Sequence, residues 1–238
     1  MAGWLRRVLT SLAGSARWER VASGAGNEPT AAESPQVSGD HGALGQFNSP
    51  MDLGVFVQTH DGVEPRLIGR TPAPAPVAIP ACTRWWVRPL GAPDVTSLSR
   101  EIEDAQIAGL ELTALSAPIL EGLERLTALE TLILAGTEVS DGHLAHLANL
   151  RRLRSLDLSH TKVTDAGIAR LKDTGPIENL NLQSARITDA GLLHLRELRQ
   201  LRRLDLSHTP VTQAGLAHLG GISDLHTLLL SGTRVRDA

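Results

Sequence analysis

The string LDLSHTKVTDAG at residues 156–167 returns almost unchanged as LDLSHTPVTQAG at residues 204–215. Each copy brings Asp, Ser and His together, which are the residue types of a hydrolase triad. Aligning the chain with itself gives a period of 24 residues, so the two strings are corresponding parts of repeated units. We therefore interpret the string as part of a scaffold, because a catalytic triad needs no second copy.

Apolar residues hold the same places in five successive units. The first two columns are Leu129, Leu153, Ile177, Leu201, Leu225 and Leu132, Leu156, Leu180, Leu204, Leu228. The next two are Leu134, Leu158, Leu182, Leu206, Leu230 and Val139, Val163, Ile187, Val211, Val235. An irregular unit of 22 residues, starting at Ile107, precedes them. Periods of this length are typical of solenoids.

At these columns the chain resembles the bacterial leucine-rich repeats of the TDAGL kind, through the pattern LxxLxLxxTxVTDAGLxxLxxLxx over residues 105–238. The resemblance implies an α/β leucine-rich-repeat solenoid, a short arc with a parallel sheet on its inner face and helices on its outer face. Threonine replaces the asparagine of the commonest leucine-rich repeats, in the column Thr137, Thr161, Ala185, Thr209, Thr233. The repeats contain no cysteine, which weakens a link to the cysteine-containing repeats of F-box proteins.

Elementary stereochemistry supports the same unit. In Leu-Asp-Leu the two leucines point to one face and the aspartate to the other, as in a β-strand. A hydroxyl residue then stands where a helix N-cap is needed, at Ser140, Thr164, Thr188 and Thr212. An aspartate follows it in three units, where we expect it to interact with the positive end of the helix dipole. One unit cannot fold alone, whereas stacked units share faces and pair strands.

Both ends of the repeat array need a cap. Residues 82–104 read as a strand followed by a helix and, with Trp85 and Trp86, are the candidate N-terminal cap. At the other end the chain stops at TRVRDA, where a further unit would supply Gly and Leu. We expect the last repeat to be incomplete and the chain to be a fragment of a longer protein.

The segment before residue 82 differs in composition from the repeats. Residues 1–22 fit an amphipathic helix with four arginines and one glutamate, which lies on an anionic membrane or is a frayed or locally packed terminus. Residues 23–80 are predicted to be disordered or linker, because they offer little apolar surface, and 71–80 to be a polyproline-like spacer. A short hairpin about Asp61-Gly62 is predicted within this region, at residues 53–69.

Composition excludes several classes of function. A net charge of −3 argues against a general nucleic-acid binder, and the repeats from residue 101 carry 14 basic and 18 acidic side chains. Cys82 is the only cysteine, so neither an intrachain disulfide nor a cysteine-rich zinc site can form. No apolar run reaches the length of a membrane span, and the N-terminus is a poor secretory signal. We expect a cytoplasmic protein.

Three readings assign chemistry to the repeats. If the sheet is parallel, Asp157 and Asp205 lie roughly 9–10 Å apart, the spacing of an inverting glycosidase pair. Nothing around them singles out one carboxylate as an acid, and the Ser-His-Asp string has neither a pocket nor an oxyanion donor. His146, His194 and His218 share a helical position without a recurring carboxylate, so we interpret them as solvated. We predict no catalytic residue, metal site or cofactor.

We therefore predict a non-enzymatic module that binds a protein or peptide partner through the concave repeat surface. The candidate contact residues are Ile133, Asp157, Ser159, Asn181, Gln183, Asp205, Ser207 and Leu229. No aromatic side chain is expected on this face. The alternatives are a membrane-associated scaffold anchored by residues 1–22 and the repeat part of a longer multidomain protein.

Overall fold

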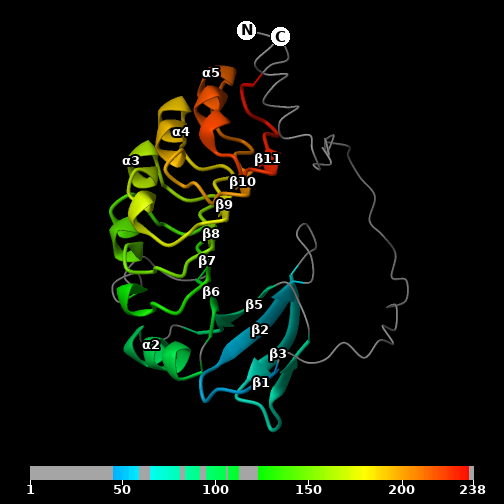
Figure 1. The fold of residues 1–238 in the computed structure, drawn as a ribbon. Helices are drawn as coiled ribbons and strands as arrows, with labels where there is room; N and C mark the ends of the chain where they lie inside the picture. The colour runs from blue at the N-terminus through cyan, green and yellow to red at the C-terminus, as the bar shows by residue number, and fades with distance from the viewer. Residues whose placement is uncertain are drawn as a thin grey trace, which may run out of the picture.

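The computed structural model describes residues 45–58, 65–80, 84–91, 95–105, 107–112 and 123–235. The helix predicted for residues 1–22, the predicted linker up to residue 44 and the last three residues lie outside this part. Figure 1 shows the repeats as an arc, with strands along the inner side and helices along the outer side.

A single sheet follows the whole arc, in the order β11-β10-β9-β8-β7-β6-β5-β2-β3. The repeats supply the parallel strands β6 (Gly109–Glu111), β7 (Thr131–Ile133), β8 (Ser155–Asp157), β9 (Asn179–Asn181), β10 (Arg203–Asp205) and β11 (Thr227–Leu229). Each strand is three residues long and pairs in register with the same residues of its neighbours. The predicted leucine-rich-repeat solenoid is confirmed.

Short helices cover the outer side of the sheet (Figure 1). They are α2 (Val95–Asp104), α3 (Asp165–Ile168), α4 (Asp189–Leu195) and α5 (Gln213–Leu216). The 3-10 turns η2 (Leu123–Arg125), η3 (His143–Leu147) and η4 (Leu171–Asp173) lie between them, and η5 (Ala217–Gly221) follows α5. Each of α3, α4 and α5 begins after a threonine whose hydroxyl accepts a backbone N–H, as the N-cap prediction requires.

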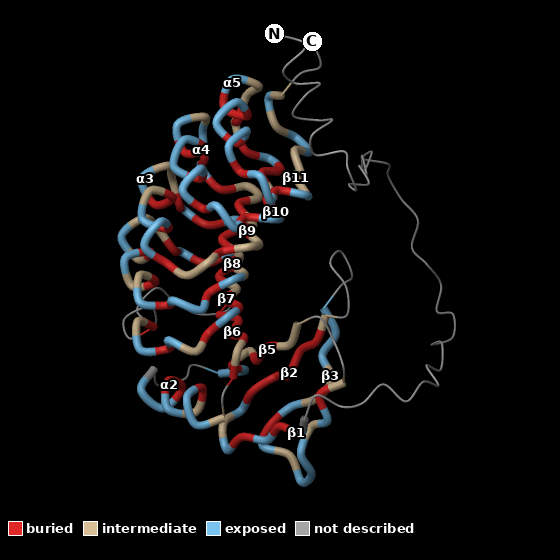
Figure 2. Tube along the Cα trace, viewed as in Figure 1, coloured by how far each residue is buried: buried red, intermediate tan, exposed pale blue. Residues whose placement is uncertain are grey.

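The core lies between the sheet and these helices, as the band of buried residues in Figure 2 shows. The apolar columns supply it: the middle leucines Leu156, Leu180 and Leu204 are at most 2% exposed. On each of these strands, the residue before the leucine and the residue after it are half-buried. Leu228 and Leu230 of the last unit are packed against the core but only partly buried.

Among the described residues between 45 and 80, the antiparallel β2–β3 pair agrees with the hairpin predicted at residues 53–69, whereas the strands on either side of it form where a linker was predicted. This segment forms β1 (Gly45–Phe47), β2 (Leu53–Gln58), β3 (Arg66–Thr71) and β4 (Val77–Ile79). The strand β2 pairs antiparallel both with β3 and with β5 (Arg84–Pro89). The strand β4 lies within the proposed spacer and pairs antiparallel with β1. These strands are held by apolar side chains that the composition made look sparse: Leu53, Val55 and Ile79 are buried in the same core as the repeats, although Leu67 of β3 is exposed. The turn predicted at Asp61-Gly62 lies outside the described residues.

A left-handed residue follows each of the strands β7 to β11 and turns the chain toward the outer side. Gly136 and Gly232 occupy this place with a φ of 68°. The same place holds His160 (φ 54°), Ser184 (φ 56°) and His208 (φ 58°), although side chains disfavour this conformation. The histidines of the opening strings therefore sit at a backbone turn.

Neighbouring units are joined by the threonine and aspartate of the TDAG segment. The carboxylate of Asp165 accepts the backbone N–H of Thr188 at 2.8 Å and its hydroxyl at 2.6 Å. The Asp141–Thr164 and Asp189–Thr212 pairs repeat both distances. The regular spacing of Thr and Asp therefore links one helix start to the next, beyond any interaction with the helix dipole.

Candidate interaction surface on the concave face

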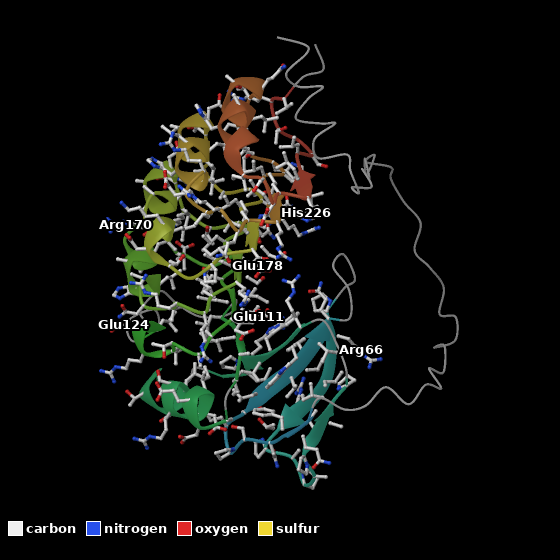
Figure 3. The ribbon with its side chains drawn as sticks, in the orientation of Figure 1. Arg66, Glu111, Glu124, Arg170, Glu178 and His226 are labelled. Atoms are coloured by element: carbon white, nitrogen blue, oxygen red, sulfur yellow. The ribbon has the colours of Figure 1, made fainter. Side chains whose placement is uncertain are left out.

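Each repeat strand offers two side chains to the concave face, one on either side of its buried leucine. The residues after the leucine form what we call the aspartate row: Glu111, Ile133, Asp157, Asn181, Asp205 and Leu229. Five of the eight predicted contact residues belong to this row, and the register places them side by side. Figure 3 shows Glu111 on this inner side, and Glu124 and Arg170 on the outer side.

The residues before the leucine form a second row, which was not predicted. This arginine row consists of Gly109, Thr131, Ser155, Asn179, Arg203 and Thr227. The sequence pattern could have predicted this second row, because residues two positions apart on a strand share a face and each aspartate-row residue has such a neighbour. The concave face therefore carries two parallel rows about 6.6 Å apart along the strands.

The predicted contact residues Ser159 and Ser207 do not reach the surface. They are 5% and 7% exposed, because the chain turns outward at the left-handed residue that follows each of them. Their backbone N–H groups donate to Asp157 and Asp205, at 2.8 and 2.9 Å. Their expected place on the contact surface is wrong, and their role is to orient the two carboxylates.

Asn181 is held in the same way. Its Oδ1 accepts the backbone N–H of Gln183 at 3.0 Å, and its Nδ2 donates to Oδ2 of Asp157 at 3.0 Å. Gln183 itself lies two residues beyond the row member Asn181 along the chain and is half-buried. Both oxygens of Asp157 are thus engaged, whereas Asp205 is held through Oδ1 alone among the described residues.

The two rows line a hollow of about 270 Å³. Its other wall comes from the N-terminal strands and the loop beside them, with Gln58, Pro65, Arg84, Trp86 and Arg88. None of these wall residues was predicted, since the segment that holds three of them was read as a cap and the rest as a linker. The hollow exists because β5 and β2 continue the curved sheet past the first repeat.

Glu111 joins the wall to the repeats. This carboxylate is only 4% exposed; it accepts the indole N–H of Trp86 at 2.7 Å and pairs with Arg88 at 2.5 Å. The guanidinium of Arg88 also lies 4.3 Å from the ring centre of Phe56, which is stacked on Trp86. Aromatic side chains thus do reach the concave side, but they are buried beneath charged groups.

Arg84 extends from the wall over the arginine row. Its Nη1 donates to the hydroxyl of Ser155 at 2.8 Å, on the third repeat strand. Gly109, the first member of the row, allows β5 to approach: a Cβ there would lie 2.5 Å from the carbonyl oxygen of Trp85. The guanidinium of Arg84, a wall residue, therefore lies in the arginine row at Ser155.

The contacts of the opening strings are those of a scaffold. The carboxylate of Asp157 accepts a backbone N–H and an amide N–H, and no hydrogen bond joins it to the imidazole of His160 in the described structure. Nowhere in the described ranges do three His, Cys, Asp or Glu side chains gather closely enough to hold a metal ion. The described helices are also too short or too polar to cross a membrane.

The comparison with protein-family models agrees with the repeat assignment. A family model described as a leucine-rich repeat matches residues 149–172, and a search of curated protein sequences finds no significant match. An internalin (inlF) from Listeria monocytogenes is similar over 60% of this chain and 46% of its own, with 23% identity and a TM-score of 0.46. An internalin C2 (inlC2) from that organism is similar over 56% and 65%, with 20% identity and a TM-score of 0.42. This chain spans less than two thirds of either internalin. The matched repeat and the register of β6–β11 identify the repeated units as leucine-rich repeats.

Proposed function

We propose that this chain is a non-enzymatic interaction module that binds a protein or peptide segment in the hollow of its concave face. One observation carries the proposal: the polar side chains of the aspartate row are oriented in advance by backbone hydrogen bonds. Side chains that are already ordered lose little conformational entropy when a partner binds. A module that only binds needs no reactive group, and the carboxylates serve as fixed acceptors.

The repeats themselves are suited to a rigid scaffold, and we assign them to the TDAGL kind. The support for this finer assignment is the Thr–Asp link, which recurs between three successive pairs of units. Because each link joins one unit to the next, the concave rows keep their spacing when a partner binds.

A peptide selection tests the proposal. The full chain is immobilised and panned with a phage library of random 12-residue peptides, in parallel with the Asp157→Arg/Asp205→Arg variant. We expect to select peptides that bind the wild type and bind the variant at least about tenfold more weakly, because the variant replaces two carboxylate acceptors of the row with two positive charges. The Lys172→Glu/Asp173→Lys variant, altered at two exposed outer residues, is the control. Equal binding to all three proteins would place the binding surface elsewhere.

A further inference from the structure

The two rows of the hollow carry opposite charge at the same strands. On β10, Arg203 lies in the arginine row and Asp205 in the aspartate row. On β8, the aspartate row holds Asp157, and the arginine row holds Ser155 with the guanidinium of Arg84 bound to it. The β8 and β10 strands are two strand spacings apart, about 9.6 Å. Each row therefore presents two like charges, and each charge has an opposite one across the rows.

The two charges on β10 are not neutralised by neighbours. Within the described residues the side chain of Arg203 has no hydrogen bond or ion pair, and the carboxylate of Asp205 accepts only the backbone N–H of Ser207. The two side chains, both half-buried in the hollow, are not paired with each other. They are available to a partner without breaking an existing ion pair.

Other charges near the hollow are already paired. Arg88 is bound to Glu111 beneath the wall. At the margin of the strands, Glu178 pairs with Arg154 and lies 3.7 Å from Arg202. Among the described residues of β10, the charges left to recognise a partner are Arg203 and Asp205, and these two sum to zero. A segment of one sign would be attracted by one row and repelled by the other.

We propose that the hollow recognises a peptide segment in which an acidic and a basic side chain lie within four positions of each other. The acidic side chain binds at the arginine row beside Arg203, and the basic side chain binds at the aspartate row beside Asp205. In an extended segment that crosses the strands, adjacent side chains point to opposite sides and so reach one row each. This partner chemistry rests on the proposed function, that the hollow is a peptide site.

Two conservative variants separate the two charges. Asp205→Asn keeps the oxygen that accepts from Ser207, as Asn181 already does for Gln183 in the neighbouring repeat. Arg203→Gln removes the cation and leaves a polar side chain. The exposed residues Asp173 and Lys172, changed to Asn and Gln, are matched controls on the outer side. Circular dichroism and the melting temperature establish that each variant is folded.

The same 12-residue library is then panned on the wild type and on each variant. Peptides selected by the wild type should be enriched in acid–base pairs and should bind each hollow variant about two- to fivefold more weakly. Peptides selected by Asp205→Asn should keep the acid and lose the base, and those selected by Arg203→Gln the reverse. Wild-type peptides of one sign, or variants that weaken acid and base dependence alike, would overturn the inference while leaving a peptide site. Absence of any peptide that distinguishes the wild type from Asp157→Arg/Asp205→Arg would overturn the proposed function as well.

Discussion

The link between the helices α3 and α4 allows a prediction about how an alanine at position 191 changes the free energy of unfolding. Gly191 lies in the first turn of α4, and a Cβ built there would stand 2.4 Å from Oδ1 of Asp165 and 3.2 Å from its Cγ. That carboxylate is the one that accepts two hydrogen bonds from Thr188. An alanine at 191 would therefore displace the carboxylate and break the link.

The magnitudes follow from the hydrogen bonds that each substitution removes. Asp165→Ala removes two hydrogen bonds to a charged group, but Thr188 is exposed and water can replace them, so we expect a loss of about 1.5–3 kcal/mol of unfolding free energy. Gly191→Ala sacrifices the same bonds but adds about 1 kcal/mol of helix propensity, for a net loss of about 0.5–2 kcal/mol. When Asp165 is already alanine, a Cβ at 191 still lies 2.9 Å from Cγ2 of the buried Ile187. Gly191→Ala should then cost about 1.5–3 kcal/mol less than it does in the wild type, because no hydrogen bonds of Asp165 remain to be lost.

A double-mutant cycle measures this difference in the cost of Gly191→Ala. The four proteins are unfolded with urea, and circular dichroism monitors the transition. If their m-values are equal, the differences between the transitions report stability. We expect a coupling of about 1.5–3 kcal/mol between the two sites. The same cycle with Asp173→Ala, an exposed outer aspartate, should be additive. If Gly191→Ala cost the same with and without Asp165, steric exclusion by the carboxylate would not be the reason for glycine.

Three further predictions rest on single sites. Gly136→Ala should lower the stability by about 1–2 kcal/mol, because the φ of 68° at this residue disfavours a side chain. Gly142→Ala should raise the stability by about 0.4–1 kcal/mol, because this glycine has a φ of −61° and open space around it. Thermal melts of the two variants check this, and equal effects would contradict it. Ala185→Thr should add about 1 kcal/mol of stability, measured by urea unfolding, because Thr161 and Thr209 in the same column each donate to the backbone carbonyl three residues earlier. A loss of stability would mean that this unit has no room for the larger side chain. Glu111→Leu should cost about 2–4 kcal/mol and change the fluorescence of Trp86, while Glu111→Gln, which keeps an acceptor, should cost less; similar losses for both would show that the contacts of the carboxylate are not what matters.

The sequence predicts the single repeat well because its contacts recur at a fixed separation along the chain. The buried leucines, the threonine N-caps and the inward-facing aspartates all follow from period and stereochemistry. The same reasoning failed at Ser159, where alternation places the side chain on the concave face and the left-handed His160 turns the chain away from it. A histidine gives little local warning of that conformation, whereas the glycine at 136 in the same column does.

What the sequence alone determined is the number, spacing and core of the repeats, together with one row of the concave face. Only the tertiary structure decided what closes that face. Arg84 contacts Ser155, 71 residues away along the chain, and Trp86 contacts Glu111, 25 residues away; the repeat period predicts neither contact. The physical reason is that β2 and β5 do not repeat: their place depends on how the curved sheet continues past its first unit, and on Gly109 leaving room for it.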